Sequence, residues 1–201
     1  NSKIHYIKNK KNTGYSAGNN VGLRYLVNEK HCGYVFIANP DVIFEDSTIR
    51  EMHQTMLEHQ DIALIATKRY GHDGATLHQY FDFPTLTTSM KNCFFFPRRK
   101  FEKRRHFKQN MEIDLAKEPV YVDAVPGAFF GIKSEFLLKN NFIYEGIFLY
   151  GEEIVLGHQA HDLGYKVAVI NTDVYIHDHV QARFSNRKMF WYDRQSVKVY
   201  Y

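Results

Sequence analysis

Two adjacent carboxylates, Glu152 and Glu153, follow an aromatic stretch at residues 144–150 and a single glycine. Apolar residues then recur at roughly helical spacing as far as Gly164, so the pair is predicted to lie in the first turn of a helix. The positive end of a helix favours a carboxylate anion by about 0.3–1 kcal/mol. An ionised carboxylate can take a proton from a hydroxyl group, although acidic residues also occur at ordinary helix starts.

A third carboxylate, Asp41, ends the sequence Asn39-Pro40-Asp41, which directly follows the apolar run 34–38. Ligand-binding residues of open α/β sheets emerge where strands end, and the proline stops this strand. A carboxylate in that crevice suits a hard cation such as Mg²⁺ or Mn²⁺ bound to phosphates. The same three residue types are also common in ordinary turns that bind no ligand.

Glycines at positions 14, 18 and 22 are four residues apart, and in a helix they would share one face. They could allow another backbone to approach closely, or they could admit a diphosphate to backbone N–H groups at a helix start. Their spacing differs from that of a P-loop and the lysine of that motif is absent, which argues against an ATPase.

Five segments in a fixed order resemble the inverting glycosyltransferases of family 2, which have the GT-A fold. They are residues 12–22 (NTGYSAGNNVG), 34–41 (YVFIANPD), 125–133 (VPGAFFGIK), 144–153 (YEGIFLYGEE) and 174–179 (VYIHDH). The resemblance is strongest to the branch that builds bacterial surface polysaccharides, which includes rhamnosyl and galactofuranosyl transferases.

The resemblance implies a metal-dependent enzyme that uses Mn²⁺ or Mg²⁺ to move a sugar from a nucleoside diphosphate to a glycan or lipid-linked acceptor. It aligns the catalytic base with Glu153. The neighbouring Glu152 is difficult to distinguish from Glu153 in this role. It implies Asp41 and His177 as metal ligands, with His179 as a competitor of His177. The implied donor-binding residues are Asn12, Gly14, Asn19, Asn39, Asp41, Gly127 and Ala128, and the implied acceptor pocket holds Phe148 and Tyr150.

The chain departs from the family pattern at three of these places. Asn39 stands where the family has the first aspartate of an Asp-any-Asp motif, and Glu153 stands where it usually has aspartate. Gln159 replaces an arginine that relatives carry later on the same helix. An alternative is therefore a non-catalytic module that binds sugar nucleotides or glycans with the same fold.

The predicted elements alternate between strands and helices, as in an α/β layered domain. We expect a mixed, mainly parallel central sheet flanked by helices. Helices are predicted at 16–28, 46–59 and 152–163 and a hairpin at 72–74; strands are predicted at 3–7, 34–38, 62–67, 120–125, 128–132, 166–170 and 174–177. From the family we expect further strands before residue 1, one catalytic domain over 1–184, and a C-terminal aromatic and basic helix over 185–201.

Composition fits a cytoplasmic enzyme made of one globular domain. Of the 201 residues 44% are hydrophobic, and two cysteines are too few for a disulfide framework. No apolar stretch reaches the roughly 18–20 residues that span a bilayer. The basic tract 98–108 is predicted to be a solvated face or a contact with anionic headgroups at the inner membrane surface. A net charge of +4 without a nucleic-acid motif argues against nucleic acid.

Overall fold

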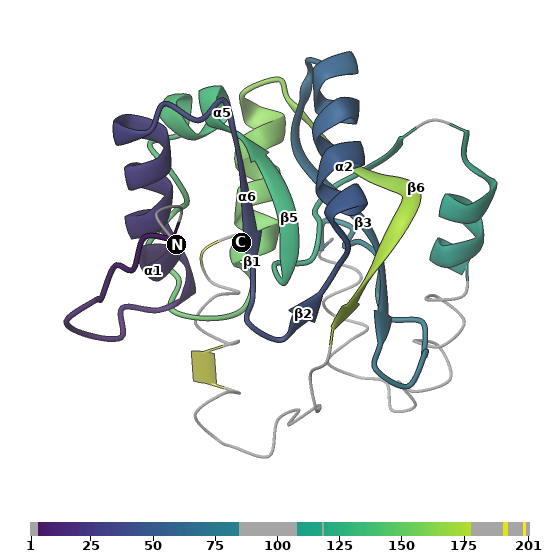
Figure 1. Ribbon diagram of the computed structural model, residues 1–201, viewed down its shortest axis with the longest axis horizontal. Helices are drawn as coiled ribbons and strands as arrows, with labels where there is room; N and C mark the ends of the chain where they lie inside the picture. Colours follow the sequence, from purple (N-terminus) through teal and green to yellow (C-terminus); the bar gives the residue numbers. More distant parts are fainter. Residues whose placement is uncertain (1–3, 85–107, 118, 178–190, 193–198, 200–201) are drawn as a thin grey trace.

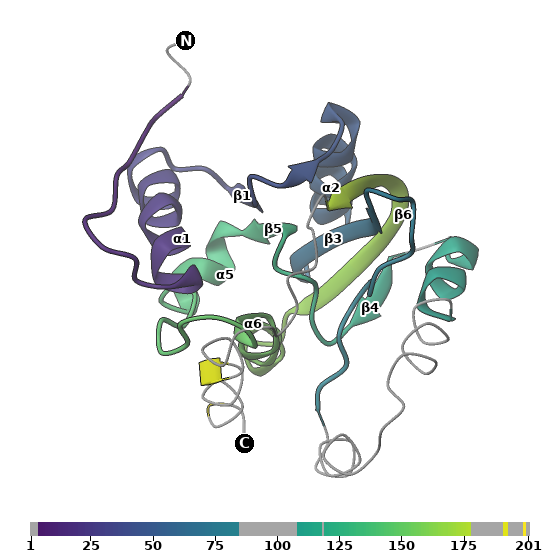
Figure 2. The same cartoon turned by 90° about the horizontal axis from the view of Figure 1, so that it is seen from below.

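The computed structural model describes residues 4–84, 108–117, 119–177, 191–192 and 199. Helices cover both faces of a twisted central sheet (Figures 1 and 2). Helix α2 (Asp46–Glu58) packs Met52 and Met56 on one face. Helices α1 (Tyr15–Arg24), α5 (Ser134–Lys139) and α6 (Glu152–Asp162) contribute to the core on the opposite face. Strand side chains alternate between these two cores, as a period of two requires.

The strands follow the order β1-β5-β3-β6-β2, and β4 pairs with β6 off this path. Their bounds are β1 Tyr34–Ala38, β2 Val42–Ile43, β3 Ile62–Gly71, β4 Val120–Val122, β5 Phe129–Lys133 and β6 Lys166–His177. The first residues of β5 lie opposite the last residues of β1, because Ala38 pairs with Phe129. The short strand β2 pairs with the end of β6.

The sheet is mixed, as expected, but the expectation of mainly parallel pairing is wrong for the described strands. Only β3 and β6 pair in parallel, and the other four pairings are antiparallel. The crossover through α2 does give β1 and β3 the same direction, as the alternating pattern implies. Strand β5 then enters between them in the opposite direction and makes both of its contacts antiparallel.

Most predicted helices are confirmed, with changes at their ends. The helix expected over 16–28 is α1 followed by a π-helical segment, Tyr25–Glu29. The strands expected over 166–170 and 174–177 form one strand with an irregular register near Ile170. The turn at 72–74 is present, since the Gly71 N–H donates to the Ala75 carbonyl at 2.8 Å.

The strand predicted at 3–7 is wrong for its described part. Residues 4–7 are exposed and contain no strand, and no described strand pairs with them. An apolar alternation becomes a strand only when a neighbour satisfies its backbone groups. Strand β2 and helix α5 were not predicted, because each is too short to give a clear periodic pattern. The described part of the chain contains no helix long and apolar enough to cross a membrane.

Helix α6 carries the paired glutamates, and it lies very close to the connection between β4 and β5. A Cβ at Gly157 would lie 2.2 Å from the Asp123 carbonyl oxygen and 3.0 Å from the Ala124 Cβ. Only glycine permits this approach. The position of the glutamates therefore depends on a residue that has no side chain of its own.

We predict that Gly157→Ala lowers the free energy of unfolding by about 1–3 kcal/mol, because the added carbon forces the helix away from the connection. Gly18→Ala in α1 is the matched control, since nothing lies within 4 Å of its would-be Cβ. That variant should be as stable as the wild type or more stable, because alanine favours a helix. Urea unfolding measures both, and equal losses would contradict the packing argument.

Candidate active site

The predicted donor residues meet where β1 ends and β5 begins. The Asn39 N–H donates to the Ala128 carbonyl at 2.8 Å, which joins two segments far apart in the sequence. The chain then turns, with the Val42 N–H donating to the Asn39 carbonyl at 3.2 Å. Asp41 lies in this turn. The predicted neighbours Asn39, Asp41 and Ala128 are thus gathered at one edge of the sheet.

The two predicted metal ligands also lie together. Pairing between β2 and β6 sets Val42 opposite His177. The His177 Nε2 lies 3.3 Å from the Asp41 Oδ2, and both side chains are partly exposed, at 17% and 34%. No cluster of three or more His, Cys, Asp or Glu residues able to hold a metal occurs in the described part of the chain, and His179 lies outside that part. Among the described residues, Asp41 and His177 are the two side chains that could bind a cation here.

Gly127 connects the predicted base to the sheet. Its N–H donates to the Glu153 Oε1 at 3.3 Å, and its carbonyl accepts a hydrogen bond from the Tyr15 hydroxyl. A Cβ at this position would lie 3.0 Å from the Glu153 Oε1 and 3.3 Å from the Tyr15 hydroxyl. The predicted role of Gly127 as a floor without a side chain fits this geometry. Tyr15 was not predicted; its only signal was its position at a glycine-flanked helix start.

The two glutamates have different surroundings. Glu152 is 6% exposed, and burial, with a further contribution from the charge of Glu153, raises its pKa to about 8. Its Oε2 has no hydrogen-bond partner among the described residues. Burial also raises the pKa of Glu153, but backbone N–H groups and the charge of Arg69 oppose that rise. Burial therefore raises the pKa of both carboxyls, and the groups that oppose this rise are more numerous at Glu153 than at Glu152.

The loop before α6 carries the predicted acceptor residues. The Phe148 carbonyl accepts the Tyr15 N–H at 3.0 Å, and the Phe148 ring stacks on that of Tyr192 with centroids 4.6 Å apart. Tyr150 has a φ of 70° and is 38% exposed, and Gly151 has a φ of 87°. These two left-handed residues turn the chain sharply into α6, which brings Glu152 and Glu153 under the aromatic loop.

The start of α1 is held against this loop. Gly14 has a φ of 93°, and a Cβ there would lie 2.5 Å from the Phe148 carbonyl oxygen. The Asn12 Oδ1 accepts the Gly14 N–H at 3.1 Å and shapes the turn. The Asn19 side chain instead donates to the Tyr15 carbonyl within α1, at 3.0 Å. Close backbone approach, predicted for three glycines, thus occurs at Gly14; nothing lies within 4 Å of a Cβ built at Gly18 or Gly22.

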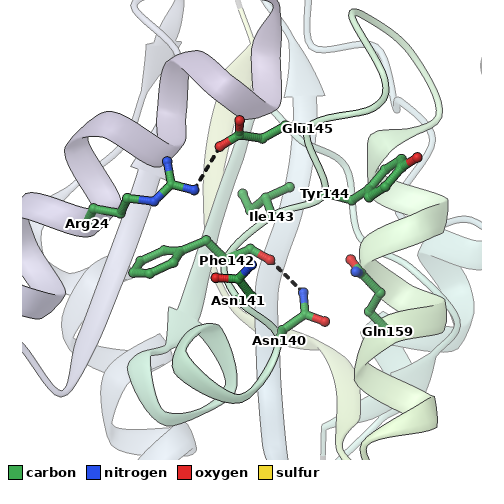
Figure 3. Close-up of a pocket in the computed structure, with 8 residues that line it drawn as sticks. All are labelled: Arg24, Asn140, Asn141, Phe142, Ile143, Tyr144, Glu145 and Gln159. Atoms are coloured by element: carbon green, nitrogen blue, oxygen red, sulfur yellow. Dashed lines mark hydrogen bonds and ion pairs between the residues drawn. The ribbon is translucent and has the colours of Figure 1, made fainter.

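A separate pocket of about 290 Å³ lies between α1, the loop 140–145 and α6 (Figure 3). Arg24 and Glu145 form an ion pair of 2.9 Å at its edge, and Gln159 lines its far side. None of the predicted site residues lines it. Gln159, where the resemblance led us to expect an arginine, therefore lines this pocket, which does not include the glutamate pair.

Comparisons with known proteins found a sequence family and a solved structure that this chain resembles. The sequence model of the family described as "Glycosyl transferase family 2" matches residues 1–125. The low-salt glycan biosynthesis hexosyltransferase Agl10 of Haloferax volcanii is 33% identical over 76 residues, which make up 38% of this chain and 24% of that protein.

A structural likeness supports the fold. The crystal structure of GalNAc-T7 with UDP, GalNAc and Mn²⁺ matches with a TM-score of 0.61 and 12% identity, over 96% of this chain and 36% of that one. The chain thus spans about a quarter to a third of the length of these two proteins. The likeness confirms the expected GT-A-like α/β fold.

We predict that Glu152→Gln removes a pH dependence of stability. A pKa of about 8 in the folded protein, against an ordinary value of 4.5, means that folding favours the protonated form. This stabilisation is complete below the ordinary value and is lost as the pH rises through about 8. The glutamine variant stays neutral, so relative to the wild type it should gain stability between pH 5 and pH 8.5.

Urea unfolding at these two pH values tests the prediction. Glu58→Gln at the exposed end of α2 is the matched control, and its difference from the wild type should be the same at both pH values. A Glu152→Gln difference that does not change with pH would contradict the protonated assignment.

Proposed function

This chain belongs to glycosyl transferase family 2, and from that premise we propose that it moves a sugar from a nucleoside diphosphate to a hydroxyl group of a glycan or lipid-linked acceptor. One observation carries the proposal. Glu153 contacts Gly127 on one side of a short backbone segment, and Asp41, next to His177, lies on the turn that is bonded to Ala128. A base and a diphosphate-binding edge thus flank residues 127–128.

In the proposed reaction the acceptor hydroxyl attacks the anomeric carbon while the nucleoside diphosphate departs from the opposite face, which inverts that carbon. The new bond joins the acceptor oxygen to the sugar, and the bond to the phosphate oxygen breaks. Glu153 takes the hydroxyl proton, a contribution of roughly 10²–10⁴-fold. The Gly127 N–H holds its carboxylate, and Phe148 and Tyr150 form the acceptor side.

The donor set at Asp41 and His177 fits a divalent cation. One carboxylate oxygen and one imidazole nitrogen lie 3.3 Å apart, and their partial exposure leaves room for phosphate oxygens. A carboxylate with an imidazole is compatible with Mn²⁺ and less natural for Mg²⁺. When bound, such an ion would offset the charge that builds on the leaving diphosphate. Asn12, Gly14, Asn19 and Asn39 complete the proposed donor side.

The biological setting proposed is the assembly of bacterial surface polysaccharide at the inner face of the cell membrane. The resemblance of the five motifs supports it. The second candidate, a non-catalytic sugar-nucleotide or glycan-binding module, is favoured by Asn39 in place of a metal-binding aspartate. Metal-dependent hydrolysis of a panel of sugar nucleotides by the full-length protein separates the two, because only an enzyme releases the nucleoside diphosphate.

We predict that Asp41→Ala abolishes Mn²⁺-dependent binding of a nucleoside diphosphate and leaves the fold intact, because it removes a partly exposed carboxylate rather than core. Calorimetry with UDP or dTDP, with and without Mn²⁺, measures the effect. Asp46→Ala, which removes an exposed carboxylate on α2, should bind as the wild type does. Unchanged affinity in Asp41→Ala would reject the metal assignment.

We predict that Glu153→Gln lowers kcat by at least about 10²-fold with little change in donor affinity, the pattern of a group that acts in the transition state. Glu152→Gln should lower kcat less, since neighbouring residues on a helix point about 100° apart and only Glu153 contacts Gly127. Steady-state rates decide this. The reverse order of effects would move the base to Glu152, and two active variants would place it elsewhere.

A further inference from the structure

The pocket of about 290 Å³ beside α6 contains a polar atom that no described residue satisfies. The Gln159 Oε1 is buried and accepts no hydrogen bond within the described part of the chain. Its side chain faces the pocket across from Asn140 and Asn141 (Figure 3). Native structures rarely leave a buried amide oxygen without a donor. A molecule bound in the pocket can supply the missing donor.

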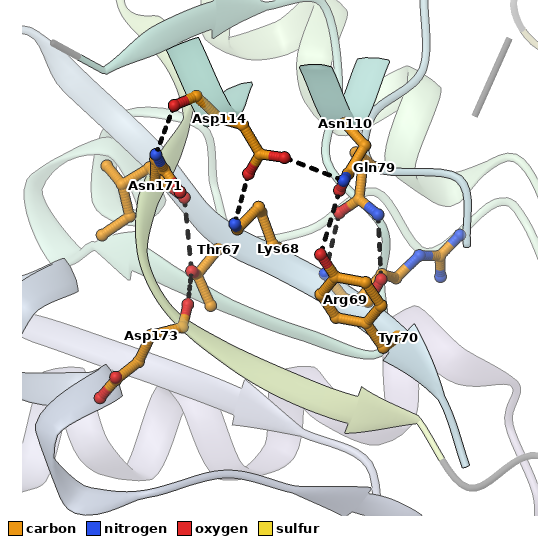
Figure 4. A network of polar contacts seen from close by, with 10 residues as sticks. Thr67, Lys68, Arg69, Tyr70, Gln79, Asn110, Asp114, Asn171 and Asp173 are labelled. Carbon is orange, nitrogen blue, oxygen red and sulfur yellow. Dashed lines mark hydrogen bonds and ion pairs between the residues drawn. The ribbon is translucent and has the colours of Figure 1, made fainter. Parts of the chain in front are cut away.

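A second polar cluster, between β3 and the helical segment 108–115, shows the contrast (Figure 4). The Lys68 Nζ lies 2.6 Å from the Asp114 Oδ1. The side chain of Gln79 accepts the Arg69 N–H at 2.8 Å and donates to the Arg69 carbonyl at 2.9 Å. None of the side chains labelled in Figure 4 has a buried polar atom without a partner among the described residues. That cluster stabilises the fold, whereas the pocket beside α6 leaves an acceptor for a ligand.

The wall opposite Gln159 is held in place by a buried amide. Asn20 has no exposed surface, and its side chain accepts the Ile143 N–H at 3.1 Å and donates to the Ile143 carbonyl at 2.7 Å. The same side chain donates to the Glu145 Oε1 at 2.8 Å. That oxygen also accepts from Arg24 at 2.9 Å. The ion pair at the edge of the pocket is therefore fixed before any ligand arrives.

The loop that lines the pocket has an unusual backbone. Asn141 has a φ of 54° and Phe142 a φ of 68°, a region that residues with a side chain seldom occupy. The Asn140 side chain donates to the Phe142 carbonyl at 2.7 Å and closes the turn. Sparsely populated backbone conformations persist where the surroundings hold them, and they cluster at binding sites. The Arg24 guanidinium lies 5.0 Å from the centroid of the Phe142 ring, which adds to that hold.

The chemistry of the lining selects the class of ligand. Its two charged groups, Arg24 and Glu145, neutralise each other, which disfavours an anion such as phosphate. The amides of Asn140, Asn141 and Gln159 offer both donors and acceptors, and so does every hydroxyl of a sugar. Pockets for drug-sized molecules measure about 300–1,000 Å³. The volume of about 290 Å³ therefore suits a single ring.

We propose that this pocket binds one neutral sugar ring through the Arg24–Glu145 ion pair and the three amide side chains. Gln159 lies seven residues beyond Glu152, which is two turns or about 10 Å along α6, so this ring is not the one that reacts. The ring is either a further unit of the acceptor glycan, a source that rests on the proposed function, or a free sugar, which does not require it.

The test follows the side-chain amide signals of the full chain labelled with ¹⁵N, with those of Gln159 assigned by their absence from Gln159→Met. Methyl glycosides of hexoses, deoxyhexoses and N-acetylhexosamines are titrated singly, and inorganic phosphate is titrated for comparison. At least one glycoside should shift the Gln159 signals saturably, with a Kd of about 1–10 mM, the affinity that about a dozen non-hydrogen atoms support. Phosphate should leave these signals unmoved.

Variants show whether the amide makes the contact. Followed by backbone signals, the same glycoside should bind at least about tenfold more weakly to Gln159→Met and Gln159→Leu, because each loses the hydrogen-bonding group. Two variants guard against one that does not fold. Gln54→Met removes an exposed amide on α2 and should bind as the wild type does. The proposal is overturned if no glycoside shifts the Gln159 signals, if phosphate shifts them instead, or if folded variants bind as tightly as the wild type.

Transfer assays separate the two sources of the ring. If it belongs to the acceptor, Gln159→Met should raise KM about tenfold for an acceptor of several sugar units and leave KM unchanged for an acceptor of one unit. Two unchanged KM values with weakened glycoside binding identify a free sugar. If the wild type binds the glycoside but transfers no sugar, the proposed function fails and the sugar site stands. Transfer without glycoside binding overturns the sugar site alone.

Discussion

The candidate site depends on the absence of a side chain at one position, Gly127. The N–H of this residue contacts the Glu153 carboxylate, and its carbonyl accepts the Tyr15 hydroxyl. A methyl group there would lie within 3.0–3.3 Å of both side chains. Helices α1 and α6 and the segment before β5 therefore meet around a peptide without a side chain, and a larger residue would have to displace the polar groups of Glu153 and Tyr15.

Burying two adjacent carboxylates is unfavourable, and the surrounding structure reduces that penalty unequally. Glu153 receives a backbone hydrogen bond and lies in the field of Arg69, whereas the Oε2 of Glu152 has no hydrogen-bond partner among the described residues. The two carboxyls share their burial but differ in the groups that compensate for it, as in pairs of carboxyls whose environments differ. Burial raises the pKa of both carboxyls, and more groups oppose that rise at Glu153 than at Glu152. The asymmetry follows from position, since the two residues are chemically identical.

Local sequence pattern predicted the parts of this site that depend on local structure. The helix that carries the glutamates begins directly after Gly151 and ends shortly before Gly164, two glycines that the sequence shows and that both have a positive φ. The pairing of Asp41 with His177 followed from a resemblance in motif order, because it depends on which strands become neighbours. Tyr15 and Arg69 were missed because each acts on residues distant in sequence, and no spacing rule reports such contacts. The antiparallel pairing of β5 with β1 and β3 was not predicted for the same reason, because it depends on contacts between strands that are distant in sequence.

The start of β5 also explains why the proposed chemistry is divided between two sides. An inverting displacement needs the proton acceptor and the leaving group on opposite faces of one carbon, so the base and the phosphate-binding residues must come from different elements. For the proposed reaction, residues 127–128 would meet this requirement within a single dipeptide: Gly127 bonds to Glu153 of α6, and Ala128 bonds to Asn39 beside the Asp41 turn. Because Phe129 is locked into the sheet immediately afterwards, opposite Ala38, the separation of the two sides is set by the backbone rather than by flexible side chains. Rigidity of this kind is what a reaction that depends on alignment requires.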